Sequence, residues 1–200
     1  MSFRKEQKFR LTQSDQQLLK VQLQAKGMTQ LYPERGIQSC YFDTINLTLF
    51  WQSEEGVLPR KKVRLRWYDD PVSLTKEVKH SSVEGRFKTT EPYKTNTATQ
   101  DFKNIELHDP VYGRLIPTVC VSYQREYFML NQLRITFDRA ISYQDMRSFG
   151  RRVQSDPETV MEIKTNIDTP DDYINSVVPY PTTRFSKYCR ALLAFEQNLR

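Results

Sequence analysis

Basic and acidic side chains alternate with apolar ones in several short segments of this chain. Side chains two positions apart in a β-strand lie on the same face, so each segment would have one charged face and one apolar face. In residues 3–11, for example, Glu6 and Lys8 share one face and Phe9 lies on the other. The charged faces of seven segments hold Arg4, Glu6, Lys8 and Arg10; Arg64 and Arg66; Glu77 and Lys79; Glu84, Arg86 and Lys88; Arg125; Arg134, Thr136 and Asp138; and Glu162 and Lys164.

A charged face of this kind could be a solvated surface with cross-strand ion pairs, which are common and weak. That interpretation suits any one strand, but a solvated sheet normally mixes threonine, glutamine and serine among its charges. The alternative is a sheet closed into a barrel with the charged face inward. Two like charges about 4 Å apart repel by roughly 4 kcal/mol at an effective dielectric constant of about 20, so a basic lumen would require a bound anion.

A chain of phosphates matches rows of lysine and arginine, because guanidinium groups bind phosphate oxygens through two parallel hydrogen bonds. The carboxylates Glu6, Glu77, Glu162 and Asp138 lie among these cations. They indicate a divalent cation, because Mg²⁺ and Mn²⁺ bind one or two carboxylates together with phosphate oxygens. The residues by themselves therefore predict a metal-assisted site for a nucleoside triphosphate or polyphosphate.

The elements that would position these side chains are mostly strands. A two-residue period predicts strands over residues 3–11, 37–43, 61–68, 73–80, 83–90, 117–130, 133–138, 140–145 and 158–165. A helix is expected from Ser14, because Gln17 completes a capping box, and Gly27 would end it. A short helix is expected over 45–53.

The closing segment 185–198 is predicted to be a helix with one apolar face. Lys187 follows Ser186 at its start, where a helix N-terminus favours anions. Residues 91–115 read as a polar loop with one helix near 98–107, and residues 168–181 read as turns. The whole order predicts an α+β fold of mostly antiparallel strands in a single domain over residues 1–200. If the sheet closes into a barrel, it would have a charged lumen with the helices packed outside.

The composition is that of a globular protein, with 12% aromatic and 27% charged residues, and its net charge of +6 favours an anionic partner. No apolar stretch of about 18 residues is present, and the first residues lack the apolar core of a signal peptide. Three unevenly spaced cysteines indicate reduced thiols rather than a disulfide scaffold or structural zinc. We therefore expect a cytoplasmic protein without a membrane span.

The charged segments also resemble a known family. The matching motifs, in order, are Glu6-Gln7-Lys8-Phe9-Arg10, Tyr41-Phe42-Asp43-Thr44, Val63-Arg64-Leu65-Arg66, Glu77-Val78-Lys79, Arg134-Ile135-Thr136-Phe137-Asp138, Glu162-Ile163-Lys164 and Ser186-Lys187-Tyr188. From about Arg4 to Arg190 the chain resembles the VTC domain, the polyphosphate polymerase of the triphosphate tunnel metalloenzyme (CYTH-like) superfamily. The wider superfamily often begins Glu-x-Glu-x-Lys, and Arg4 in place of the first glutamate fits the polymerase branch better than the small-triphosphate hydrolases.

The resemblance implies an antiparallel tunnel that binds triphosphate or polyphosphate with Mn²⁺ or Mg²⁺. The phosphate ligands that it implies are Lys8, Arg64, Arg66, Lys79, Lys88, Arg125, Arg134, Lys164 and Lys187, with Arg86 as the alternative to Lys88. Among these, Arg64, Arg66 and Lys164 would carry catalysis. Glu162 is the first candidate for metal ligand, with Glu6 and Glu77 after it.

The reaction implied is transfer of the γ-phosphate of ATP to the end of a growing polyphosphate chain. The acceptor is an ionised phosphate, so no catalytic base is required, which agrees with the presence of only His80 and His108. A hydrolase of tripolyphosphate or nucleoside triphosphates and a non-catalytic polyphosphate or nucleotide sensor remain alternatives. A nucleic-acid partner fits poorly because duplex DNA needs an exposed basic stripe. Eukaryotic members of the family sit in membrane assemblies, which leaves a membrane partner open.

Several other residues are expected to be structural. Tyr41, Phe42 and Trp67 could stack on adenine but fit a core better, and Asp43 would end a strand. The three cysteines are expected to be small buried apolar residues, and the pair Lys61-Lys62 is expected to be solvated.

Overall fold

The computed structural model describes residues 4–94, 102–148 and 152–196. Its strands are β1 (Arg4–Leu11), β2 (Thr29–Asp43), β3 (Arg60–Tyr68), β4 (Asp70–Ser81), β5 (Arg86–Tyr93), β6 (Leu107–Asp109), β7 (Gly113–Leu130), β8 (Leu133–Asp145), β9 (Arg152–Ser155) and β10 (Thr159–Asn166). Its helices are α1 (Gln13–Ala25), α2 (Thr48–Glu55), α3 (Asp171–Val177) and α4 (Lys187–Glu196), with a 3₁₀ turn η1 over Phe102–Asn104.

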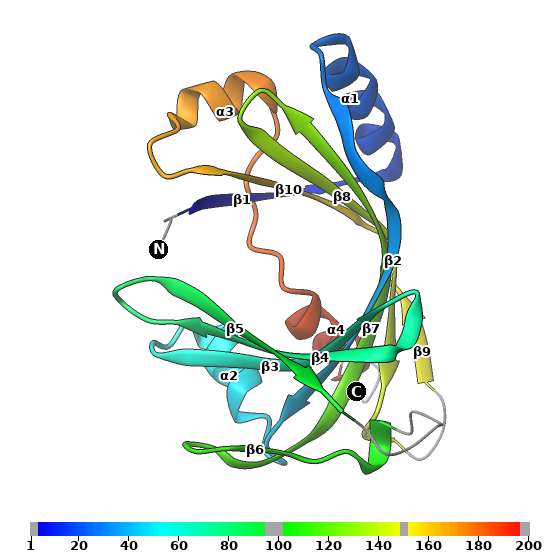
Figure 1. Cartoon of the computed structure of the whole chain (residues 1–200), viewed down its shortest axis with the longest axis vertical. Helices are drawn as coiled ribbons and strands as arrows, with labels where there is room; N and C mark the ends of the chain where they lie inside the picture. The colour runs from blue at the N-terminus through cyan, green and yellow to red at the C-terminus, as the bar shows by residue number, and fades with distance from the viewer. Residues whose placement is uncertain (1–3, 95–101, 149–151, 197–200) are drawn as a thin grey trace. The chain divides into compact units, whose positions relative to one another are not determined.

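The strands form one sheet in the order β1-β10-β8-β7-β2-β3-β4-β5, with β6 paired to β7 and β9 to β8 (Figure 1). Neighbours such as β1 and β10, or β3 and β4, run antiparallel. The predicted α+β class and antiparallel sheet are confirmed, and the arrangement fits an α+β tunnel fold. The charged lumen stays a prediction.

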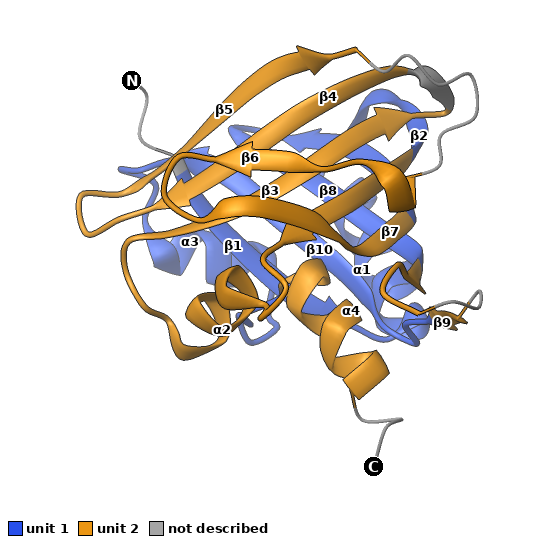
Figure 2. Ribbon diagram, turned by 90° about the horizontal axis from the view of Figure 1, so that it is seen from below, with its two compact units in different colours: residues 1–36, 123–141, 155–185 blue, residues 37–122, 142–154, 186–200 orange. Residues whose placement is uncertain are grey.

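The chain divides into two compact units, each made of three separate stretches (Figure 2). Unit 1 comprises residues 1–36, 123–141 and 155–185. Unit 2 comprises residues 37–122, 142–154 and 186–200. The single domain over residues 1–200 stays a prediction.

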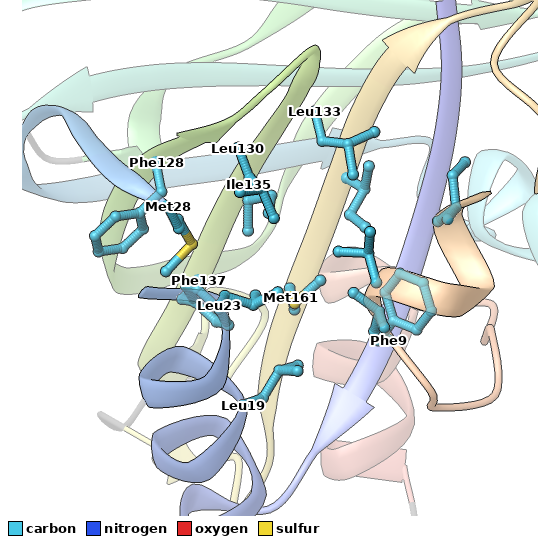
Figure 3. Close-up of a cluster of buried hydrophobic side chains, with 14 of the residues drawn as sticks. Phe9, Leu19, Leu23, Met28, Phe128, Leu130, Leu133, Ile135, Phe137 and Met161 are labelled. Carbon is cyan, nitrogen blue, oxygen red and sulfur yellow. The ribbon is translucent and has the colours of Figure 1, made fainter. Parts of the chain in front are cut away.

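Unit 1 has its own hydrophobic core on one face of β1, β10 and β8. Leu19 and Leu23 of α1 are fully buried in a cluster with Phe137 of β8 and Met161 of β10. Figure 3 shows Leu23 beside Phe137 and Met161. Because side chains alternate along a strand, burying this apolar face leaves the opposite face of the same strands to the charged residues.

Unit 2 has a second core, in which Phe42 of β2 and Leu65 of β3 are almost completely buried. Trp67 lies stacked on Phe102, with ring centroids 4.6 Å apart. The expectation that Phe42 and Trp67 belong to the core is confirmed. Cys40 and Cys189 are buried as expected, but Cys120 is only half-buried.

Asp43 does more than end a strand. Its side chain is fully buried and accepts hydrogen bonds from the backbone N–H groups of Leu49 (2.9 Å) and Phe50 (2.8 Å) in the first turn of α2. The hydroxyl of Tyr188 in α4 also donates to Asp43. A carboxylate at the start of a helix satisfies otherwise unpaired N–H groups, so Asp43 joins β2, α2 and α4.

Several predicted boundaries were wrong. Thr12 rather than Ser14 caps α1, since its hydroxyl accepts from the backbone N–H of Asp15 at 3.1 Å. The tight turn Ser82–Gly85 moves β5 to residues 86–93, and the turns expected over 168–181 contain α3. Of the helix expected near 98–107, residues 98–101 lie outside the described part. The rest holds only the 3₁₀ turn η1 over Phe102–Asn104 and the first residue of β6, Leu107.

Candidate functional site

In unit 1, neighbouring strands β1 and β10 place two glutamates and two lysines side by side. Their register sets Glu6 opposite Lys164 and Lys8 opposite Glu162. The Lys8 ammonium group lies 3.4 Å from Glu6 Oε1 and 3.8 Å from Glu162 Oε2, and Lys164 Nζ lies 2.9 Å from Glu162 Oε1. We call these four residues the glutamate–lysine cluster.

The charge state of Glu162 follows from its neighbours. Burial raises its pKa, but the positive charges of Lys164, Lys8 and Arg125 outweigh burial and hold the pKa well below its usual range. Glu162 is therefore an anion at neutral pH, although only 8% of its surface is exposed. An ionised carboxylate is the form that binds a divalent cation.

Arg125 of β7 is held by a carboxylate on β8. Its Nε lies 2.5 Å from Asp138 Oδ1 and its Nη2 lies 2.7 Å from Oδ2. Burial opposes this charge, but the Asp138 carboxylate raises the pKa of the guanidinium well above its ordinary value. Paired in this two-pronged way, Arg125 has a fixed orientation.

Thr136 of β8 lies on the same charged face, opposite Glu162 in the register of β8 and β10. It is 7% exposed, and its hydroxyl group has no hydrogen-bond partner among the described residues. Leaving a buried hydroxyl unpaired costs roughly 1–3 kcal/mol. The hydroxyl is therefore available to a ligand at this face.

The donor set of unit 1 fits a divalent cation that brings its own phosphate. Among the residues that the structure describes, no group of three or more His, Cys, Asp or Glu side chains could hold a metal ion. Mg²⁺, however, binds through one or two carboxylates and takes its other ligands from phosphate and water. Glu6 and Glu162, which share Lys8, and the unpaired Thr136 hydroxyl meet that requirement.

In unit 2, the carboxylate of Glu77 in β4 binds three cationic side chains. Arg64 Nε and Nη2 lie 2.8 Å and 2.5 Å from Glu77 Oε2, and Lys88 Nζ lies 2.8 Å from Oε1. Arg66 Nη1 is 3.6 Å from Oε2. Burial raises the pKa of Glu77, but Arg64, Arg66 and Lys88 together lower it to about 2. We call these four residues the Glu77 cluster.

The Arg64 guanidinium is also held from β2. Its Nη1 donates to the Tyr41 hydroxyl at 2.9 Å, and the Tyr41 ring stacks on Tyr188 with centroids 4.9 Å apart. Burial raises the pKa of Tyr41, yet Arg64 and Arg66 shift it below its ordinary value. Tyr41 thus positions Arg64, and because its oxygen accepts this bond, its own proton can be donated elsewhere.

Three lysines form a row across β3, β4 and β5. The register sets Lys79 opposite Lys62 on one side and Lys88 on the other. Lys62 is half-buried and donates to Ser186 Oγ at 2.7 Å, so the expectation that it is solvated was wrong. Like charges directly opposite one another in a sheet are destabilising, and a bound anion would relieve them.

Lys187 is the first residue of α4 and follows Ser186, whose hydroxyl accepts from the backbone N–H of Cys189 at 3.3 Å. Ser186 therefore caps the start of α4. Lys61, the other residue expected to be solvated, binds both carboxylate oxygens of Asp109, at 3.0 Å and 2.9 Å. Lys61 therefore has a structural role on the apolar side of β3.

The residues predicted from the sequence thus fall in two places. Unit 1 holds Glu6, Lys8, Arg125, Arg134, Glu162 and Lys164, and unit 2 holds Arg64, Arg66, Glu77, Lys79, Lys88 and Lys187. Lys88 rather than Arg86 contacts Glu77. The roles of Tyr41 and Lys62 were missed, because their partners Arg64, Tyr188 and Ser186 are distant in sequence.

Comparison with known proteins identifies the family of this chain. A family model described as the VTC domain matches residues 3–196. This chain belongs to the VTC domain family. No curated protein matched the sequence.

Solved structures similar to this VTC domain share its fold at low sequence identity. The PH1012 protein of Pyrococcus horikoshii has a TM-score of 0.56 at 11% identity, over 94% of this chain and 99% of its own. A Bacillus halodurans protein described as a candidate adenylate cyclase has a TM-score of 0.58 at 14% identity, over 90% and 92%.

A third structure, from Hippeastrum, is described as a candidate adenylyl cyclase with a dominant triphosphatase activity. Its TM-score is 0.55 at 15% identity, over 94% of this chain and 95% of its own. At 11–15% identity, these likenesses show that the VTC domain shares its fold with the three proteins. None of the described helices of this VTC domain is long and apolar enough to cross a membrane.

Proposed function

We propose that this VTC domain is a metal-dependent polyphosphate polymerase that transfers the γ-phosphate of ATP to a growing polyphosphate chain. The observation that carries the proposal is the match to the VTC domain over residues 3–196. The Glu77 cluster supports it, because three cations share one carboxylate there and so retain charge for an anion. Either polyphosphate or tripolyphosphate could be the acceptor of the γ-phosphate.

In this proposal the basic residues bind and orient phosphates. Arg64 and Arg66 would stabilise negative charge on the transferred phosphoryl group through guanidinium N–H groups that Glu77 and Tyr41 already orient. We propose Lys164 of the glutamate–lysine cluster as the third residue that carries catalysis. The acceptor oxygen is ionised before reaction, so no side chain has to remove a proton.

Glu162, with Glu6 beside it, would hold the divalent cation. A bound Mg²⁺ or Mn²⁺ would supply positive charge that offsets the negative charge of the phosphates. Lys8 and Lys164 are the ammonium groups that neutralise these glutamates without the cation. Lys8 and Lys164 would then be the groups of this cluster that bind phosphate oxygens. We propose the remaining predicted residues Lys79, Lys88, Arg125, Arg134 and Lys187 as further phosphate ligands.

The test is incubation of the purified chain with γ-labelled ATP and Mn²⁺, followed by gel electrophoresis and a free-phosphate assay. A ladder of labelled polymer is the expected result. Release of free phosphate without polymer would overturn the polymerase proposal.

A triphosphate hydrolase is the second candidate, and the triphosphatase activity in the description of the Hippeastrum structure favours it. The same residues would bind the substrate, with water replacing the phosphate acceptor. Free phosphate released from tripolyphosphate, with no labelled ladder from ATP, would identify this activity.

A further inference from the structure

An arginine–tyrosine cluster lies in unit 1 beside the residues already described. It consists of Tyr32 and Arg35 of β2, Tyr127 of β7 and Arg134 of β8. The Tyr32 and Tyr127 rings meet edge to face with centroids 5.9 Å apart. The Arg35 guanidinium carbon lies 5.9 Å from the Tyr32 centroid and 6.0 Å from that of Tyr127, and Arg134 lies 6.0 Å from Tyr32.

The two arginines of this cluster differ from other arginines of unit 1 in their partners. Arg125 binds Asp138, and Arg139 binds Glu34 at 2.7 Å. The Arg35 and Arg134 guanidinium groups contact only tyrosine rings, and neither forms an ion pair or hydrogen bond within the described part of the chain. Their N–H donors are therefore available to a ligand.

The rings orient these guanidinium groups without neutralising them. A cation over an aromatic face gains about 0.5–1 kcal/mol at an exposed site, and the planar group keeps its N–H edges for an acceptor. Tyr32 itself is 45% exposed, so the cluster opens to solvent. Two cations held around one ring repel each other, and an anion that bridges them removes this repulsion.

The cluster continues the row of the glutamate–lysine cluster. Arg134 is the direct cross-strand partner of Lys164, and Lys164 is the partner of Glu6. Neighbouring strands lie about 4.8 Å apart, so Lys164 and Arg134 succeed one another at the spacing of adjacent strands. Strand β7, which carries Tyr127, separates Arg134 of β8 from Arg35 of β2. A linear polyanion bound at Lys164 could therefore reach Arg35 by extending across β8 and β7.

We propose that Arg35, oriented by Tyr32 and Tyr127, continues the phosphate-binding row beyond Arg134 and binds phosphates of a long polyphosphate chain that tripolyphosphate does not reach. This inference rests on polyphosphate being the substrate in the proposed function. It assigns to this cluster the preference for long chains over tripolyphosphate. The bound groups are phosphates rather than bases, since Arg35 and Arg134 already lie over the Tyr32 ring on which a base would stack.

The test compares binding of tripolyphosphate and of long-chain polyphosphate to the wild type and to Arg35→Gln, by calorimetry without ATP. Arg35 is exposed, so its replacement should leave the fold intact. We expect Arg35→Gln to bind the long chain about tenfold more weakly, because one charge-assisted contact is lost. Binding of tripolyphosphate should be unchanged. The matched control is Arg139→Gln, which removes the same charge from an exposed arginine that Glu34 already pairs.

The outcomes separate this inference from the proposed function. Wild-type protein that binds neither polyanion would overturn the proposed function. Wild-type protein that binds both, with Arg35→Gln unchanged or with both ligands weakened equally, would overturn the chain-length inference alone. Single-stranded RNA would be tested in the same way as a competing polyanion. If Arg35→Gln bound RNA more weakly than the wild type but bound long-chain polyphosphate equally well, the chain-length inference would also be overturned.

Discussion

The two charged regions of this VTC domain differ in how their charges balance. In unit 2, one buried carboxylate, Glu77, serves Arg64, Arg66 and Lys88, so positive charge is in excess. In the glutamate–lysine cluster of unit 1, two carboxylates face two ammonium groups. The excess positive charge of the Glu77 cluster can be neutralised by a bound anion. In the balanced glutamate–lysine cluster, a divalent cation could replace the lysines at the glutamates while a phosphate replaces the glutamates at the lysines. The alternating sequence pattern is the same in both, and the ratio of charges distinguishes their chemistry.

The largest effect should come from removing a cation of the Glu77 cluster. Arg64→Ala should lower turnover about 10²–10³-fold, because a charge-stabilising donor of the reaction is lost. Turnover would be followed with labelled ATP, and folding by thermal unfolding. Arg114→Ala, which removes an exposed arginine paired with Glu106 in the same unit, should leave turnover unchanged. An Arg64→Ala rate equal to that of the wild type would contradict the assignment of this cluster to phosphate.

The next largest effect should come from removing a carboxylate of the glutamate–lysine cluster, and it should distinguish this cluster from the Glu77 cluster. Glu162→Gln should weaken Mn²⁺ binding and lower turnover about 10²-fold, because a neutral amide is a poorer ligand for a hard cation. Mn²⁺ binding in the presence of tripolyphosphate would be measured directly by electron paramagnetic resonance. Glu158→Gln, whose carboxylate pairs with the exposed Arg10, is the matched control. Unaltered Mn²⁺ affinity in Glu162→Gln would place the cation elsewhere.

A smaller effect should identify the role of the unpaired hydroxyl in unit 1. Thr136→Val should leave the free energy of unfolding unchanged or raise it by up to about 1 kcal/mol, because no internal hydrogen bond is lost. Its affinity for tripolyphosphate should fall several-fold. Thr159→Val offers the contrast, since its hydroxyl donates to the Leu11 carbonyl at 3.0 Å and its loss should destabilise the fold. Equal destabilisation by both variants would mean that Thr136 has only a structural role.

The smallest effect should appear in the acid stability of the Glu77 cluster. The pKa of Glu77 is lowered from 4.5 to about 2 in the folded protein. Its contribution to stability is therefore complete above pH 4.5 and is lost as the pH falls toward 2. Glu77→Gln should be less stable than the wild type at pH 7, with the difference closing over that interval in denaturant unfolding. Glu91→Gln, at an exposed pair with Lys76, should follow the wild-type pH profile throughout.

The sequence predicted the strands well where alternation was strong, and less well where it was interrupted. In residues 3–11 every even position is charged and Phe3, Phe9 and Leu11 occupy odd positions, and β1 (Arg4–Leu11) is present there. The first half of β2 was missed because Pro33 and Gly36, which normally interrupt strands, lie within it. That half supplies Tyr32 and Arg35, so the cluster proposed to bind long chains could not be anticipated.

The contact partners of a side chain were harder to predict than the face of the strand on which it lies. The alternation placed Arg64 and Glu77 correctly on charged faces, but a two-residue period carries no information about which atoms meet. Asp43 illustrates the limit, because its hydroxyl partner Tyr188 lies 145 positions away in the chain. Such contacts depend on the order of strands in the sheet, which local pattern does not determine.

The interleaving of the two units has a consequence for the evolution of this domain. The chain passes from one unit to the other after residues 36, 122, 141, 154 and 185. Neither unit therefore corresponds to a continuous piece of a gene. The Glu77 cluster nevertheless lies within residues 60–93, so one continuous exchange could replace it. The glutamate–lysine cluster joins residues 4–11 to residues 159–166, so a change in its balance of charges requires changes in two distant parts of the chain.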